Sequence, residues 1–287
     1  AMARLDADAR QKLEVPECIA DAFIGEVFAA GGSGSGLENA LASLVVQAGQ
    51  AIDGDHDALA LMRRKSAAAL STDLPADKTA RRPFHWPLEF PEVFARERAG
   101  FDALVGNPPF ITGKRISTVL GGTYQNYLKA TVQDSKGAAD LVVFFFRRAF
   151  SVSRNGGLIG LIGTKSISEG DSRIVGLAWL LTNGAHLVWA KHEIRWPGSA
   201  SVIVSLIVLH RGRWTGQVSL NGRDVPGIGS NLMVESKTGV PSEPYALKSN
   251  DSRRSDGIKI QGDGFILTEE ERRILLMQGQ ENEAVIS

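Results

Sequence analysis

The feature that most constrains the fold is an alternation of strand-length apolar runs with helical segments along the middle of the chain. The apolar runs are rich in β-branched and aromatic residues, and the segments between them have helical length and spacing. This alternation is typical of an α/β fold built on a mostly parallel sheet. We predict strands at 101–106, 158–164, 186–194 and 201–209, and helices at 139–153 and 174–184.

The last two predicted strands are joined by a short segment, "RWPGSA" (195–200). A parallel crossover needs about a dozen residues, so this pair is predicted to form an antiparallel hairpin. The run "LIGLIGT" (158–164) shows no polar alternation, which indicates a strand buried on both faces. The preceding "NGG" (155–157) is interpreted as the stop signal of the helix before it.

The region before this core is predicted to be helical, because apolar residues recur there at four-residue spacing. A cluster of glycine and serine interrupts it, and no strand is evident. The apolar residues are Ile19, Phe23 and Val27, the interruption is "GGSGSG" (31–36), and the second helical stretch is 58–70.

Beyond residue 212 the chain becomes rich in Gly, Ser and Asn and loses clear periodicity. The next helix is predicted at 268–278, where Thr268 as N-cap and Glu271 form a capping-box pattern. We therefore divide the chain into a helical region (1–80), an α/β region (81–212), and a linker with the start of a further unit (213–287).

Charge and cysteine content limit the possible partners and compartments. Lys+Arg and Asp+Glu are equal at 32 each, so any attraction to nucleic acid has to come from a local basic patch. A single cysteine, Cys18, excludes an internal disulfide and a multi-cysteine metal cage. No apolar run reaches the ~20 residues of a membrane span, and no signal peptide is evident. We expect a cytoplasmic protein with no metal site, since its histidines lack the spacing of zinc ligands.

The residues Asn107, Pro108, Pro109 and Phe110 follow the first predicted strand, at the end where open α/β sheets bind ligands. Two prolines stiffen this corner. The side-chain carbonyl of Asn107 and the main-chain carbonyl of Pro108 can each accept an N–H from a conjugated amine, such as that of adenine. This would free the nitrogen lone pair to attack a sulfonium methyl group. Phe110 can stack on the base, or can instead plug the core of a merely rigid turn.

The corner resembles the motif IV signature of amino methyltransferases that use S-adenosylmethionine. The longer pattern "FHWPLEFPEVF…GFDALVGNPPF…ADLVVFFFRRAF…NGGLIGLIGT" resembles the N6-adenine DNA methylases of type II restriction-modification and related phage-defence systems. The resemblance covers roughly residues 80 to 275. It implies a partial class I (Rossmann-like) methyltransferase sheet, with 101–106 as the fourth strand, 158–164 as the fifth and 186–209 as the final hairpin. It also implies that residues 107–110 form the target-base site and that double-stranded DNA is the substrate.

One part of the family pattern is missing. Such enzymes bind S-adenosylmethionine at a glycine-rich loop after their first strand, upstream of the Asn-Pro-Pro-Phe strand. The "AAGGSGSGLENA" cluster lacks a preceding strand and acidic residue. We interpret the chain as the C-terminal half of a catalytic domain, inactive alone, that needs its N-terminal half or a partner chain. Its exposed sheet edge could also support dimerisation.

Further candidates come from position along the chain. Asp140, at the start of the 139–153 helix, lines the cofactor pocket by family analogy, or else serves only as a partner of the helix dipole. Glu169-Gly170-Asp171 is either a DNA-facing loop or a turn. Five cations near the carboxyl edge are candidate phosphate contacts, although a residue of this kind is more often a solvated surface charge: Lys114, Arg115, Lys165, Arg173 and Arg195.

Two other functions stay open. Methylases of RNA bases and of protein glutamine side chains also act on conjugated amines with motifs of this type. The chain could also be a non-catalytic half that binds only DNA or a partner chain. The segment "IKIQGDGFILTEEE" resembles the opening of a target-recognition region, and this favours DNA.

Overall fold

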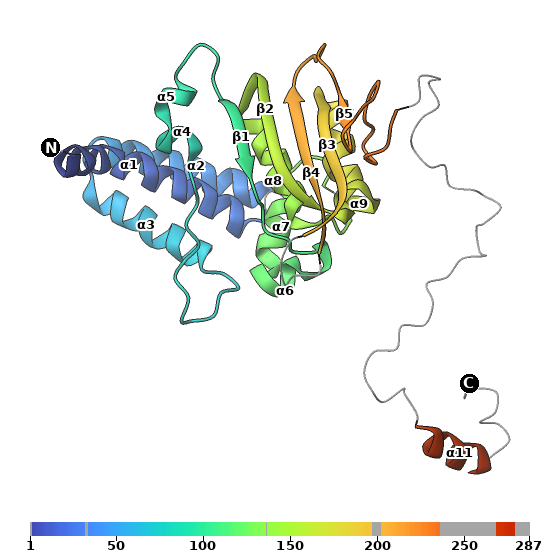
Figure 1. The fold of residues 1–287 in the computed structure, drawn as a ribbon. Coiled ribbons are helices and arrows are strands. Elements are labelled where there is room, and N and C mark those ends of the chain that lie inside the picture. The colour runs from blue at the N-terminus through green and yellow to red at the C-terminus, as the bar shows by residue number, and fades with distance from the viewer. Residues whose placement is uncertain (1, 32–33, 136, 197–201, 236–267, 279–287) are drawn as a thin grey trace. The chain divides into compact units, whose positions relative to one another are not determined.

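The computed structural model describes residues 2–31, 34–135, 137–196, 202–235 and 268–278. The chain divides into two compact units, Ala1–Ser242 and Glu243–Ser287. The first unit contains a group of helices and a mixed β-sheet (Figure 1). The described part of the second unit is one helix, which is treated by itself below.

Six strands form one mixed sheet in the order β1-β2-β4-β3-β5-β6. β1 is parallel to β2, and β4 lies antiparallel between β2 and β3, so β1, β2 and β3 run in the same direction. The predicted hairpin is confirmed, and three strands end at one carboxyl edge. The strands are β1 Phe101–Gly106, β2 Ser153–Thr164, β3 Ala185–Arg195, β4 Ile203–Arg211, β5 Ser219–Leu220 and β6 Arg223–Asp224.

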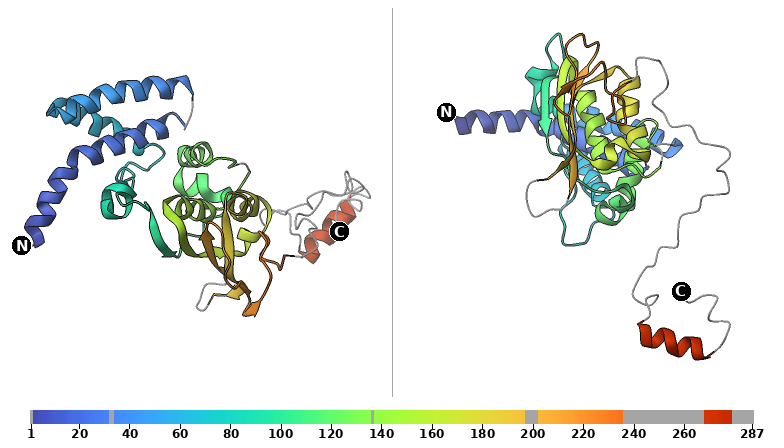
Figure 2. Two further views of the ribbon diagram at one scale, coloured as in Figure 1. Left: turned by 90° about the horizontal axis from the view of Figure 1, so that it is seen from above. Right: turned by 45° about the vertical axis from the view of Figure 1, so that its right-hand side comes forward.

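Helices pack on one face of this sheet, as the green and yellow-green ribbons in the left view of Figure 2 show. The predicted helix 139–153 is confirmed as α8, Leu141–Val152, whose apolar residues surround most of its circumference. The chain is helical from α9 (Gly170–Arg173) through a π-helical turn (Ile174–Ala178) to α10 (Trp179–Thr182), so this helical segment begins before the predicted residue 174. The core between the two layers includes Val142, Val143, Phe146, Ile159, Leu161, Leu177, Leu180, Ile207 and Leu209.

The opposite face of the sheet is only partly covered, which corrects the prediction that 158–164 is buried on both faces. Ile159 is fully buried, whereas its neighbour Leu158 is 38% exposed. β1 is also not a buried strand, because Val105 is 90% exposed. Among the described residues β1 pairs with β2 alone, so its other edge has no neighbouring strand.

The sequence "NGG" (155–157) does not end the preceding helix, because α8 already ends at Val152. It lies inside β2 and forms a bulge, since Phe101 pairs with Ser153 while Ala103 pairs with Leu158. The glycines allow this irregularity through the positive φ of 82° at Gly156. The prediction of a helix stop at these residues was wrong, because they form an irregularity within a strand.

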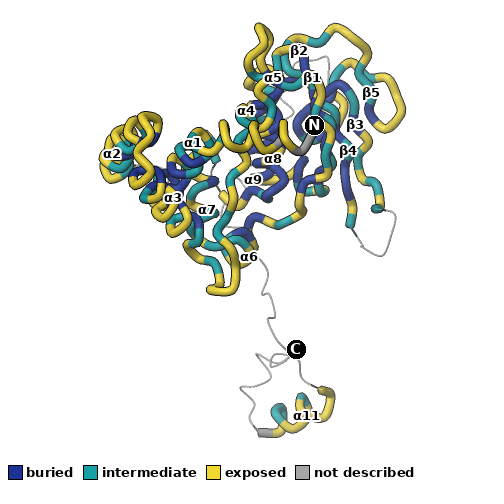
Figure 3. Tube along the Cα trace, turned by 90° about the vertical axis from the view of Figure 1, so that its left-hand side faces the viewer, coloured by how far each residue is buried: buried dark blue, intermediate teal, exposed yellow. Residues whose placement is uncertain are grey.

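The N-terminal region is helical, as predicted, and has a small core of its own around Cys18, Leu44, Leu59 and Met62. Figure 3 shows the outer surfaces of its helices as exposed. This region contacts the sheet unit where Phe28 packs against Tyr127, with ring centroids 5.7 Å apart, on helix α7. The helices are α1 Met2–Ala29, α2 Ser35–Ile52, α3 His56–Leu70, α4 Trp86–Glu89, α5 Pro91–Phe94, α6 Ile116–Leu120 and α7 Gly122–Thr131.

Residues 213–235, which we expected to be part of a linker, pack against the sheet. They contribute β5 and β6, and Ile228 and Leu232 are buried in the main core. Two-residue strands carry no periodicity that a sequence pattern could reveal, because their stability depends on the neighbouring strand. The physical unit of the sheet therefore extends beyond residue 212.

The predicted helix 268–278 is confirmed as α11, Glu269–Gln278. Its capping box is present: the Glu271 carboxylate accepts from Thr268 N at 2.8 Å, and Glu271 N donates to Thr268 Oγ1 at 3.3 Å. The backbone N–H and the hydroxyl of Thr268 both donate to the Glu271 carboxylate and hold its pKa below its ordinary value. Among the described residues, no helix combines the length and the apolar character that a membrane crossing requires.

Candidate functional site

The Asn-Pro-Pro-Phe corner begins directly after β1, at the carboxyl edge of the sheet. Pro108 is buried, whereas Asn107 and Pro109 are exposed. The Asn107 carboxamide makes no hydrogen bond to any residue that the structure describes. Phe110 is 36% exposed and belongs to none of the buried hydrophobic clusters. The corner is thus fixed through one proline and leaves an amide and a ring accessible.

Asp140 lies close to this corner at the N-cap position of α8, but its side chain does not cap that helix. One carboxylate oxygen accepts from Gly113 N at 2.8 Å. The other accepts from the hydroxyl of Ser166, in the turn that follows β2. Both oxygens are therefore engaged, and the expected contact of Asp140 with a cofactor remains a prediction.

Three of the five predicted phosphate contacts are exposed at the carboxyl edge. Lys114 and Arg115 lie in a short 3-10 turn, Gly113–Arg115, directly after the corner. Arg195 ends β3, whose direction matches that of β1 and β2. Among the described residues these side chains have no hydrogen-bond or ion-pair partner, and the phosphate contact expected of them stays a prediction.

The other two cations have protein partners. Lys165 Nζ lies 3.6 Å from Oε1 of Glu169 and 3.6 Å from Oε1 of Glu193. Arg173 is 8% exposed and donates to the Ser230 hydroxyl at 2.9 Å. Either residue would have to give up these partners in order to bind a phosphate. Both phosphate contacts therefore stay predictions, and each would require the loss of an existing interaction.

The described residues do not form the glycine-rich cofactor loop that the family resemblance implies. Such a loop connects a strand to a helix, so that backbone N–H groups face the ligand. The glycine cluster at 31–36 instead lies between two helices, α1 and α2. In the described part of the chain, no strand precedes β1. The residues present therefore do not fit the main contact with S-adenosylmethionine.

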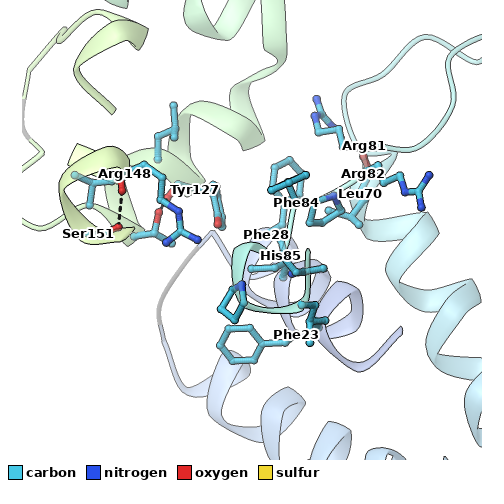
Figure 4. Close-up of a pocket in the computed structure, with 18 of the residues that line it drawn as sticks. Phe23, Phe28, Leu70, Arg81, Arg82, Phe84, His85, Tyr127, Arg148 and Ser151 are labelled. Carbon is cyan, nitrogen blue, oxygen red and sulfur yellow. Dashed lines mark hydrogen bonds between the residues drawn. The ribbon is translucent and has the colours of Figure 1, made fainter. Parts of the chain in front are cut away.

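A groove of about 1730 Å³ lies away from the corner, between the N-terminal helices, residues 81–88 and helices α7 and α8. Figure 4 shows Phe28 and Phe84 on the side of Arg81, and Tyr127 near Arg148. No residue of 107–115 lines it. Burial lowers the pKa of Arg147, which also lines the groove, to about 10. The chemistry expected from the sequence is therefore not located in this cavity.

Sequence reasoning missed the contacts that hold the corner in place. A Cβ at Gly113 would lie 2.0 Å from Ala138 O, so the two backbones touch and the position admits only glycine. Gly113, three residues after Phe110, was the one feature of the sequence that could have indicated this close backbone contact. Glu169-Gly170-Asp171 turns out to start α9, and Asp171 accepts from Ala138 N at 2.8 Å.

Comparison with solved structures gives weak similarities. The type IIL restriction-modification enzyme MmeI, solved in complex with DNA, has 17% identity and a TM-score of 0.37, with 63% of this chain and 27% of that chain covered. A modification subunit of a putative type I restriction enzyme from Vibrio vulnificus YJ016 has 17% identity and a TM-score of 0.32, covering 42% of this chain and 25% of that chain. The chain spans about a quarter of the length of both proteins.

A putative class I S-adenosylmethionine-dependent methyltransferase from Listeria monocytogenes has 12% identity and a TM-score of 0.32, covering 63% of this chain and 54% of that chain. No curated protein matches the chain. The observed α/β fold has N-terminal helices, a parallel β1–β2 pair and an antiparallel β3–β4 hairpin, and the strand pair and hairpin agree with the expected class I arrangement. A family model described as Eco57I restriction-modification methylase matches residues 56–183, a segment that contains the corner. Over these residues, the chain is similar to the Eco57I restriction-modification methylase family.

Proposed function

We propose that this chain forms the target-base half of a DNA methyltransferase that methylates the N6 amino group of adenine with S-adenosylmethionine, in restriction-modification or phage defence. Asn107 and the Pro108 carbonyl accept the two amine N–H groups, and Phe110 stacks on the extruded base. The observation that carries this proposal is the exposed Asn107 carboxamide, which has no partner among the described residues. A polar group held ready at a ligand-binding edge is what base recognition needs.

The cofactor contact is proposed to come from a further polypeptide segment, either the upstream half of the same domain or a partner chain. Two observations support this. β1 has a free edge within the described sheet, and the face that carries Val105 and Leu158 is uncovered. Neighbouring strands with apolar side chains on both faces, such as the parallel pair β1 and β2, are typical of a sheet region that helices cover on both sides. The chain alone is therefore expected to be inactive.

The main test is methyl transfer by the full-length protein with labelled S-adenosylmethionine and double-stranded DNA. Asn107→Ala is expected to lower kcat by about 10²–10³-fold, the usual loss for one carbonyl or amide that stabilises a transition state. Phe110→Ala should weaken DNA methylation, while the matched Phe110→Tyr keeps a stacking ring and most of the activity. An Asn107→Ala variant that methylates DNA at the wild-type rate would refute the assignment.

The same assay separates the alternatives. If the protein methylates RNA or a glutamine-containing peptide in preference to DNA, the proposed substrate is wrong, but the proposed methyl transfer to a conjugated amine still holds. Calorimetry of this chain with S-adenosylmethionine tests whether another segment is needed for cofactor binding. Tight binding by this chain alone would contradict the proposal that another segment supplies the cofactor loop. DNA binding without any methyl transfer by the full-length protein would favour a non-catalytic half.

A further inference from the structure

The segment that carries the proposed base site has little structure of its own. Residues 107–112 belong to no helix or strand. They are held from outside by two backbone contacts at their far end: Leu141 N donates to Ile111 O at 2.9 Å, and Gly113 N donates to the Asp140 carboxylate at 2.8 Å. Both contacts come from the start of α8. The position of the corner therefore depends on how α8 is placed.

Asp140 also connects this segment to the end of β2. Its second oxygen accepts from the Ser166 hydroxyl, and Ser166 in turn hydrogen-bonds Thr164 Oγ1 at 2.8 Å. Its backbone N donates to the Ser172 hydroxyl at 3.0 Å, which fixes it to α9. One residue thus joins the segments that follow β1 and β2 and the helix behind them.

The close approach of backbones makes this joint stiff. Gly113 packs directly on residues 138 and 139, with the position of its missing Cβ only 2.0 Å from Ala138 O and 2.7 Å from Ala139 O. The contact leaves no room for the segment to slide along the start of α8. A misplacement of about 1 Å in such a site can cost 10²-fold in rate, because the reacting atoms lose their alignment.

We infer that Asp140 is a positioning residue, which aligns the Asn107–Phe110 corner with the end of β2 through Gly113 and Ser166. Each carboxylate oxygen already accepts from a protein donor, and these two bonds tie Asp140 to the segments after β1 and β2. This inference rests on the proposed methyl transfer at Asn107.

The test uses the full-length methyltransferase and separates kcat from the KM for S-adenosylmethionine. Asp140→Ala removes both acceptors and is expected to lower kcat by about 10–100-fold, with the KM for S-adenosylmethionine within about twofold of wild type. Asp140→Asn keeps a carbonyl oxygen for Gly113 N, and its amide group can face the Ser166 hydroxyl. It is expected to recover most of the lost kcat.

The matched control is Asp171→Ala. Asp171 also accepts a backbone N–H from a neighbouring segment, that of Ala138 at 2.8 Å, but within the described part of the chain it has no hydrogen bond to residues 107–113. Its loss should lower kcat less than the loss of Asp140. Circular dichroism shows whether Asp140→Ala folds. If it does not, Ser166→Ala is used instead, because this variant removes only the bond from Ser166 to Asp140. A kcat lowered a few fold at unchanged KM for S-adenosylmethionine then supports the inference.

A different result would overturn it. A large rise in the KM for S-adenosylmethionine at unchanged kcat, in Asp140→Ala or Ser166→Ala, would assign Asp140 to cofactor binding. Equal losses of kcat in Asp140→Ala and Asp171→Ala would reduce its role to general stability. Failure of the underlying function is recognised separately, because it would leave Asn107→Ala as active as wild type.

Discussion

The two faces of the sheet differ in a way that the strand sequences alone do not reveal. On one face Ile159, Ile207 and Leu209 are at most 1% exposed beneath α8 and α10. On the other, Val105 is 90% and Leu158 38% exposed, although these residues are just as apolar. Apolar side chains on both faces are normal for a sheet covered by helices on both sides. The exposed face is therefore the one on which we propose that a further segment packs.

The covered face stabilises the fold of this chain by itself, whereas the uncovered face offers an apolar surface on which another segment can pack. The row Val105, Gly160 and Val208 crosses three strands on the uncovered face, and the position of a Gly160 Cβ lies 3.8 Å from Val105 and 4.0 Å from Val208. Gly160 leaves a shallow hollow between two valines. Substitutions on the two faces should accordingly have different consequences.

The largest difference is expected between neighbours on β2. Ile159→Ala creates a cavity in the core and should lower the free energy of unfolding by about 2–5 kcal/mol. Leu158→Ala, the adjacent residue on the other face, should cost about 1 kcal/mol or less. Urea denaturation of both variants measures the contrast. Equal losses would mean that the second face is packed as tightly as the first.

The glycines of β2 provide a second contrast. Gly157→Ala would place a Cβ 2.8 Å from Phe101 O in the bulge, and should destabilise the chain by about 1–3 kcal/mol. Gly160→Ala meets only ordinary contacts on the uncovered face and should be close to neutral. Thermal unfolding of the two variants distinguishes them. A severe loss with Gly160→Ala would show that the hollow is already filled.

The uncovered face should reveal itself in association. Val105→Asp is expected to leave the unfolding free energy within about 0.5 kcal/mol of wild type, because the side chain is exposed. It should nevertheless weaken self-association, or binding of the complementary segment, by about tenfold or more, since a charge would enter an apolar contact. Sedimentation at a series of concentrations measures this. A wild-type chain that stays monomeric at the highest concentration, and binds no complementary segment, would contradict the expectation.

The smallest effect concerns the charges at the start of β1. Arg154 and Arg96 donate to the Asp102 carboxylate at 2.5 and 2.8 Å and lower its pKa from 3.8 to about 2. A depressed pKa contributes stability that is present above about pH 4 and is lost as the pH falls toward 2. Asp102→Asn should therefore be slightly less stable than wild type at pH 6 and equal to it near pH 2. A constant difference across this range would exclude the ion pairs as its cause.

The sequence predicted the elements whose signal lies within a single segment. The apolar runs at 101–106 and 158–164 and the aromatic helix ending at Val152 are local patterns, and so is the capping box of α11. The bulge at Gly156 and the short strand β5 depend on the register of a neighbouring strand, which no local pattern encodes. The site follows the same rule. The corner itself is a contiguous motif, whereas Asp140 bonds to Gly113, which lies 27 positions earlier in the chain.

The placement of β4 between β2 and β3 has a consequence for synthesis. β2 gains its inner neighbour only after the ribosome has released residues 203–211, so the strand waits while about fifty further residues are made, roughly 2–10 s at ordinary elongation rates. During this interval the nascent chain presents a long apolar ribbon with vacant amide and carbonyl groups, the kind of surface that chaperones bind.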